Sequence, residues 1–79
     1  MKIEILGTGC PKCEALAKNV KEAISQLGLQ ADVEKVTDIA EIALRGVMMT
    51  PAVSIDGEVR IVGKVATVAE LTSLLGGVS

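Results

Sequence analysis

The sequence predicts an α/β fold with the element order β-α-β-α-β-β-α and a four-stranded mixed sheet. Three observations lead to this prediction. A short alternating strand is followed directly by a long amphipathic helix, an Asp-Gly pair later separates two β-prone runs, and a capped helix comes last. A strand, a helix and a second strand in succession form a right-handed parallel unit, whereas a hairpin adds antiparallel strands. The strand order is then second, first, third, fourth (2-1-3-4), with helices on both faces.

Length and composition limit what this chain can do. Its 79 residues suffice for one domain, so we predict a single domain over residues 1–79. A net charge of −2, with no aromatic residue and no histidine, argues against nucleic-acid binding and against histidine catalysis or histidine metal sites. No apolar run approaches the roughly 20 residues that span a bilayer. The N-terminus lacks the features of a signal peptide, so we expect a cytoplasmic location.

The first predicted strand spans residues 2–6, where apolar and charged side chains alternate. Ile3 and Ile5 then lie on a buried face, and Lys2 and Glu4 lie on a face that we expect to be solvated. A Gly-Thr-Gly turn ends this strand.

The first helix is predicted to begin at Pro11 and to end before Gly28. Proline suits the first helical position because its missing N–H would have no partner there, and glycine suits the left-handed residue just past the end. Apolar side chains recur between them at the spacing of one buried helical face. These side chains are Leu16, Ala17, Val20, Ala23, Ile24 and Leu27.

Three further strands are predicted. Residues 30–36 form the second strand, whose charged side chains indicate a sheet edge. The strongest signal in the rest of the chain is Asp56-Gly57, which lies between β-prone runs at 52–55 and 58–62. Asp-Gly accepts the positive φ values of a two-residue type I′ turn, so these two runs form a hairpin.

Two shorter helices complete the prediction. One spans residues 38–45, with Thr37 or Asp38 as its cap. The last helix begins after Thr67, and Glu70 three residues later is typical of a capping box.

The two cysteines carry the functional signal. Cys10 and Cys13 stand where the turn after the first strand becomes the first helix. A helix N-terminus offers unpaired N–H groups and a partial positive charge, which stabilise a thiolate. We therefore expect Cys10 to be an exposed thiolate and Cys13 to be shielded, the asymmetry that thiol–disulfide exchange needs. Pro11 and Lys12 complete the motif, and the Lys12 cation is expected to lower the thiol pKa further.

Thr50 and Pro51 form a second feature, directly before the third predicted strand. Proline is allowed at the first residue of a strand, and a Thr-Pro bond at such a place can be cis. With the predicted strand order, this bend lies beside the end of the first strand, next to the cysteines. The Thr50 main chain can then pair with an extended peptide, as in β-strand addition.

Together, these features resemble a minimal thioredoxin-fold protein. They are Cys10-Pro11-Lys12-Cys13 after the first strand, Thr50-Pro51 before the hairpin and Gly63 before the last helix. The resemblance covers essentially the whole chain and is greatest to the small, glutaredoxin-sized redox-active disulfide proteins of bacteria and archaea. It implies that Cys10 is the nucleophile and Cys13 the resolving cysteine. It also implies that Pro51 is a cis-proline that keeps the pair from capturing metal, and that Thr50 binds the substrate main chain.

The resemblance implies an oxidoreductase that exchanges a Cys10–Cys13 dithiol or disulfide with protein disulfides, through a mixed disulfide. Such a protein serves electron transport and cell redox homeostasis. A thioredoxin-reductase-like flavoprotein or another dithiol would reduce the oxidised pair. We expect no cofactor besides the redox-active disulfide, no metal, no nucleic-acid or membrane partner, and a monomer.

The chain departs from the family patterns at this motif. Thioredoxins carry a tryptophan before the first cysteine and Gly-Pro between the two, whereas here Gly9 precedes Cys10 and Pro-Lys lies between. Glutaredoxins have Pro-Tyr between their cysteines, and we recognise no glutathione site, so glutathione is not expected as the direct reductant. Thioredoxins also bury an acid six positions before the nucleophile. Glu4 has that spacing, so the resemblance leaves open that it assists proton transfer, but we expect it to pair with Lys2 on the solvated face.

Two other functions stay open at this point. The segment 7–13 also resembles the Cys-x-x-Cys loop of small copper chaperones, because two thiolates suit Cu(I) and Met48 and Met49 can add soft thioethers. Those chaperones end on a strand, whereas this chain ends on a capped helix, and copper gives Thr50-Pro51 no role. In the redox interpretation, the two methionines form an apolar rim instead. The second alternative is a non-catalytic interaction module on the same fold.

Overall fold

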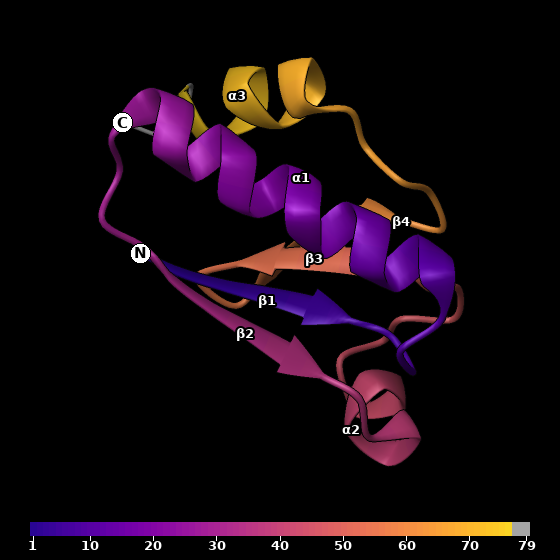
Figure 1. The fold of residues 1–79 in the computed structure, drawn as a ribbon. Coiled ribbons are helices and arrows are strands. Elements are labelled where there is room, and N and C mark those ends of the chain that lie inside the picture. The colour runs from indigo at the N-terminus through magenta and orange to yellow at the C-terminus, as the bar shows by residue number, and fades with distance from the viewer. Residues whose placement is uncertain (77–79) are drawn as a thin grey trace.

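The computed structural model describes residues 1–76 and contains the seven predicted elements in the predicted order (Figure 1). They are β1 (Lys2–Leu6), α1 (Pro11–Leu27), β2 (Asp32–Val36), α2 (Ile39–Leu44), β3 (Ala52–Ile55), β4 (Glu58–Val62) and α3 (Val68–Gly76). Residues 77–79, which end the predicted domain, lie outside the described part of the chain. Within residues 1–76, every helix falls short of the length and apolar character that crossing a membrane requires.

The four strands form one mixed sheet in the order β2-β1-β3-β4, which confirms the prediction. β1 pairs in parallel with β2 and antiparallel with β3, and β4 extends the sheet antiparallel to β3. β2 begins at Asp32 rather than Gln30, because its partner strand begins only at Lys2, which lies opposite Asp32. The hairpin turns at Asp56 and Gly57, whose φ angles of 50° and 87° are those that the Asp-Gly pair was expected to accept.

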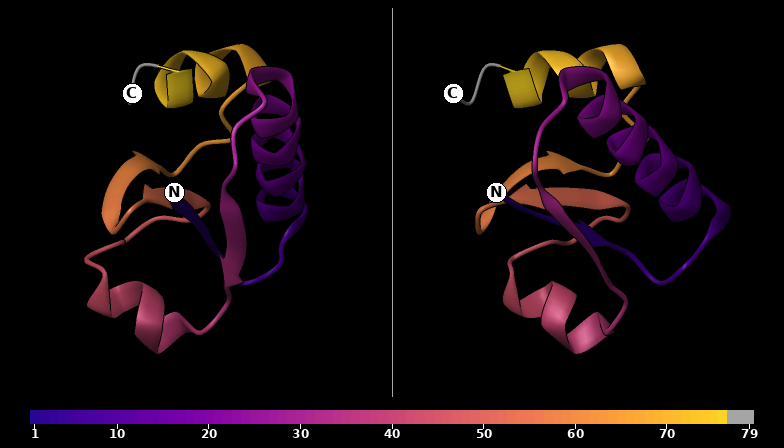
Figure 2. Two further views of the ribbon diagram at one scale, coloured as in Figure 1. Left: turned by 90° about the vertical axis from the view of Figure 1, so that its left-hand side faces the viewer. Right: turned by 60° about the vertical axis from the view of Figure 1, so that its left-hand side comes forward.

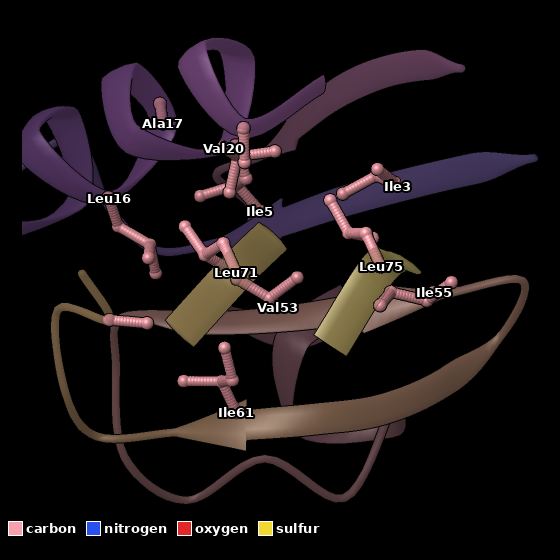
Figure 3. Close-up of a cluster of buried hydrophobic side chains, with 12 residues drawn as sticks. Ile3, Ile5, Leu16, Ala17, Val20, Val53, Ile55, Ile61, Leu71 and Leu75 are labelled. Carbon is pink, nitrogen blue, oxygen red and sulfur yellow. The ribbon is translucent and has the colours of Figure 1, made fainter. Parts of the chain in front are cut away.

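Helices cover both faces of the sheet. α1 and α3 lie together on one face, and α2 lies on the other, near the end of β1 (Figures 1 and 2). The larger core fills the space between the sheet and the α1–α3 layer (Figure 3). Its buried members are Ile3, Ile5, Leu16, Ala17, Val20, Ala23, Val53, Ile55, Ile61, Ala66, Leu71 and Leu75. The smaller core lies under α2, and its buried members are Leu6, Ile42, Val47 and Ala52.

The helix ends follow from local side-chain chemistry. Gly28 ends α1 with a φ of 64°. The Asp38 carboxylate accepts the N–H of Ala40 at 2.9 Å and caps α2, so this residue rather than its neighbour is the cap. At α3, the Thr67 hydroxyl accepts the N–H of Glu70 at 3.1 Å, and the Glu70 carboxylate accepts the N–H of Thr67 at 3.2 Å. This is the predicted capping box.

The prediction for Glu4 is also wrong. Glu4 does not lie on a solvated face: it is only 5% exposed, because α2 covers that face of β1. Its carboxylate pairs with Arg45 through two hydrogen bonds of 2.7 and 2.8 Å. Lys2 pairs instead with Glu34 on the neighbouring strand, at 3.2 Å. The alternation of side chains along β1 shows which residues share a face, but it does not show that a later helix covers the face that carries Glu4.

Candidate active site

The first turn of α1 holds both cysteines. Cys10 is the residue before the helix, with an extended backbone (φ −70°, ψ 165°), and its carbonyl accepts the first helical hydrogen bond from the Glu14 N–H at 3.1 Å. Pro11 occupies the first helical position, as predicted. One helical turn then brings the sulfur of Cys13 to 3.0 Å from the sulfur of Cys10. Both cysteines are free thiols in this structure.

The two thiols lie in different environments. Cys10 is partly exposed, whereas Cys13 is only 5% exposed. The hydrogen bond from Cys13 lowers the pKa of Cys10 from its ordinary value, and the main-chain N–H groups of Cys13 and Lys12 lower it further. Burial, followed by the hydrogen bond to Cys10, raises the pKa of Cys13. Cys10 is therefore the thiol that ionises first, with Cys13 as its hydrogen-bond donor.

Lys12 acts on Cys10 through its main chain. Its N–H, one of the unpaired groups at the N-terminus of α1, stabilises the Cys10 thiolate and so lowers the Cys10 pKa. The effect of the Lys12 ammonium on the thiol pKa stays a prediction.

Gly7 also borders the cysteine pair, which was not predicted from the sequence. A β-carbon at this residue would collide with the Cys13 sulfur and would lie 3.2 Å from the Cys13 β-carbon. The sequence placed Gly7 in a flexible turn, whereas its N–H extends the pairing of β1 by donating to Val36 at 2.9 Å. A glycine directly after a strand and ahead of a Cys-x-x-Cys motif was the available signal.

The Thr50–Pro51 bend lies against the cysteine site. Its peptide bond is cis, and Pro51 is fully buried. The Pro51 α-carbon would lie 3.9 Å from a β-carbon on Gly7, which places it beside the residue that touches Cys13. The Pro51 carbonyl accepts the N–H of Gly63 at 2.8 Å, so the end of β4 holds this bend. The structure thus brings together two segments that lie about 40 residues apart in the sequence.

A surface cavity of about 320 Å³ adjoins this site. Thr8, from the cysteine loop, and Thr50 provide its hydroxyl groups, and the rest of its lining is apolar. The apolar lining comprises Ile39, Ile42, Ala43, Val47 and Met48. Met48 is 94% exposed, and Met49 is 62% exposed and packs on Gly63. Met48 therefore lies at the apolar cavity, whereas Met49 does not line it, so an apolar rim made of both methionines stays a prediction.

Comparisons with known proteins agree with this geometry. Residues 1–76 match the family described as Thioredoxin domain. A thioredoxin of Methanothermobacter thermautotrophicus is 41% identical over 75 residues, which cover 95% of this chain and 97% of that protein. A thioredoxin of Methanocaldococcus jannaschii is 46% identical over 69 residues, which cover 87% of this chain and 79% of that protein. This chain, with one partly exposed and one buried cysteine, therefore belongs to the thioredoxin family.

Proposed function

We propose that this protein reduces protein disulfides with the Cys10–Cys13 dithiol, which is itself oxidised to a Cys10–Cys13 disulfide. The observation that carries the proposal is the contrast between two sulfurs only 3.0 Å apart. One is accessible with a lowered pKa, and the other is buried with a raised pKa. Membership of the thioredoxin family supports thiol–disulfide oxidoreductase activity in general.

The reaction proceeds in two exchanges of sulfur–sulfur bonds. The Cys10 thiolate attacks one sulfur of the substrate disulfide, that bond breaks, and the other substrate sulfur leaves as a thiolate that takes a proton. Cys13 then loses its proton and attacks the sulfur of Cys10. The mixed disulfide breaks, the substrate leaves as a dithiol, and the protein holds a Cys10–Cys13 disulfide. Two electrons have passed to the substrate.

The surroundings of the pair favour a polypeptide substrate. Thr50 is exposed, and among residues 1–76 its N–H and C=O take part in no main-chain hydrogen bond. An extended segment of the substrate can pair with these groups beside Cys10. The adjoining apolar cavity then accepts a side chain of that segment, because burial of apolar surface favours such a contact.

Recycling requires a second electron donor. A thioredoxin-reductase-like flavoprotein, or another dithiol, reduces the Cys10–Cys13 disulfide by the same exchange in reverse. We further propose that the protein acts as a monomer in the cytoplasm, where it contributes to electron transport and redox homeostasis.

A trapping experiment tests this function. A Cys13→Ser variant is mixed with a defined disulfide-bonded protein and analysed by mass spectrometry without reductant. We expect a mixed disulfide through Cys10, because the variant cannot resolve it. The matched Cys10→Ser variant, which keeps only the buried thiol, is expected to form little or none. If neither variant forms a mixed disulfide and the parent shows no reductase activity, the proposal is wrong.

The same samples separate the two alternatives. A parent protein that copurifies with one equivalent of Cu(I) and reduces no disulfide would favour a copper chaperone that uses Cys10 and Cys13. Within the described residues, no group of three or more Cys, His, Asp or Glu side chains comes together as a metal site. Cu(I) would therefore bind the sulfurs of Cys10 and Cys13, to which Met48 and Met49 can add thioethers. Binding of one partner equally by both variants and the parent would favour an interaction module.

A further inference from the structure

The buried carboxylate of Glu4 forms a close ion pair that no step of the exchange reaction uses. Arg45 presents its two terminal nitrogens to the two Glu4 oxygens at 2.7 and 2.8 Å, which is the bidentate geometry of a strong pair. The Glu4 side chain is 7% exposed and that of Arg45 28% exposed. The Arg45 Nε also donates to Glu41 at 3.3 Å, so α2 supplies both the cation and a second acid.

Other charged groups around Glu4 leave Arg45 as its direct partner. Lys2, two positions away on β1, pairs with Glu34, which lies opposite Glu4 on β2. On the other side, β3 places the buried Ser54 opposite Glu4, and its hydroxyl has no hydrogen-bond partner among the described residues. The Arg45 guanidinium holds the pKa of the Glu4 carboxyl below its usual range, although burial acts in the opposite direction.

The pair joins the two segments that build the redox site. Glu4 lies on β1, which leads within a few residues to Cys10. Arg45 ends α2 and leads, through residues 46–49, to Thr50. The ion pair therefore connects the strand that carries the cysteine loop with the segment that carries the bend.

Little else holds α2 in place. It has six residues, too few for a helix that is stable by itself. Ile42 is its only buried residue, whereas Ile39 and Leu44 are 71% and 81% exposed. Besides the buried Ile42, the ion pair between Arg45 and Glu4 attaches this helix to the sheet. A bidentate pair fixes orientation as well as distance.

We propose that Glu4 and Arg45 are a positioning pair for disulfide exchange, which sets the place of residues 46–51 relative to Cys10. Glu4 acts as a fixed negative charge and takes no proton from either thiol. The inference rests on the proposed exchange reaction, because its consequence is binding of a protein disulfide at Thr50 and the adjoining cavity.

Steady-state reduction of a defined protein disulfide tests the proposal, with kcat, KM and their pH dependence measured for each variant. Arg45→Met removes the cation, and we expect KM to rise at least about threefold while kcat and the alkylation profile of Cys10 stay close to those of the parent. Glu4→Leu/Arg45→Met replaces the whole pair by apolar side chains of similar size and leaves no unpaired buried charge, and we expect KM to stay raised because the directional contact is still missing. A matched control, Lys64→Met, breaks the exposed Lys64–Glu70 pair and is expected to change neither constant.

Several outcomes would overturn the proposal. An unchanged KM in Arg45→Met would show that the pair positions nothing. In Glu4→Leu/Arg45→Met, a KM equal to that of the parent would show that Arg45→Met acts only through an unpaired buried charge. A kcat that falls in this double variant, with a shifted pH profile, would show that Glu4 exchanges a proton with a thiol. Arg45→Lys keeps the cation but loses the two parallel hydrogen bonds, and its KM is expected to lie between those of the parent and Arg45→Met. If Arg45→Met does not fold, the proposal is tested with Arg45→Lys, and an unchanged KM in that variant would overturn it. A parent without reductase activity would instead overturn the proposed function.

Discussion

The sulfur of Cys13 lies in the space that a β-carbon on residue 7 would occupy, so the lack of a side chain at Gly7 lets the Cys13 thiol pack against the end of β1. This contact crosses from the end of the strand to the first turn of the helix. It fixes Cys13 under Cys10 at the sulfur–sulfur distance of 3.0 Å.

Gly7→Ala is expected to push Cys13 away from its position. Overpacking of a filled site costs about 1–3 kcal/mol of unfolding free energy, and displacement of the thiol slows resolution of the mixed disulfide. Urea unfolding followed by circular dichroism measures the first effect, because the chain has no aromatic residue to report fluorescence. Gly76→Ala is the matched control: its β-carbon would make an ordinary contact with Leu27 at 3.8 Å. Equal stability of the two variants would contradict the steric role of Gly7.

Cys13→Ala is expected to raise the pKa of Cys10, because it removes the hydrogen bond that contributes most to lowering it. The measurement is the rate of Cys10 alkylation against pH, followed by mass spectrometry. The midpoint moves to higher pH, and alkylation at neutral pH becomes slower. Cys13→Ser restores a hydroxyl donor and is expected to recover part of the shift. An identical midpoint in all three proteins would assign the lowered pKa to the helix N-terminus alone.

Ile39→Ser is expected to weaken reduction of a protein disulfide. Ile39 lines the cavity beside Thr50, so loss of its apolar contact lowers kcat/KM by about fivefold, the effect of roughly 1 kcal/mol at an interface. Leu44→Ser is the matched control, since Leu44 is also largely exposed on α2 but does not line the cavity. The rate with a small soluble disulfide is expected to stay unchanged in both. A similar loss in Leu44→Ser would place the substrate on another face of α2.

Glu4→Gln is expected to lower stability at neutral pH and to change its pH dependence. The folded-state pKa of Glu4 lies below its ordinary value of 4.5 because Arg45 hydrogen-bonds to the carboxylate. Its contribution is therefore fully present above the unfolded pKa and is lost as the pH falls through the folded pKa. Urea midpoints measured between about pH 3 and pH 7 check this, because parent and variant converge at the acid end. Glu34→Gln breaks only the exposed pair with Lys2 and is expected to change little. A constant difference between parent and Glu4→Gln across this range would be evidence against the linkage.

Thr67→Ala is expected to destabilise the fold without slowing exchange. The substitution removes the hydroxyl that caps α3 and costs about 1 kcal/mol. Thr72→Ala provides the comparison, because the Thr72 hydroxyl only bonds the Ala69 carbonyl within the helix, and its effect is expected to stay within about 0.5 kcal/mol. Disulfide reduction is measured well below the unfolding transition. A slowed reduction in Thr67→Ala would show that α3 affects the active site.

The elements that the sequence predicted correctly are those specified by neighbouring residues. The Asp56-Gly57 turn, the Thr67 cap and the ends of α1 depend on backbone conformations and hydrogen bonds within a few positions. The start of β2 was misplaced because a strand begins where its partner begins, and that partner lies about 30 residues away. Local signals therefore predict turns and caps better than they predict pairing limits.

The sequence by itself determined the Cys10–Cys13 spacing, the helix that carries it and the topology that brings Thr50 and Pro51 to it. Helix periodicity, capping and the right-handed crossover are enough for these conclusions. Only the tertiary structure decided that Glu4 is buried under α2, and that Cys13 needs a glycine at residue 7. Both facts depend on which surfaces meet after the chain has folded, and packing of that kind leaves no period or motif in the sequence.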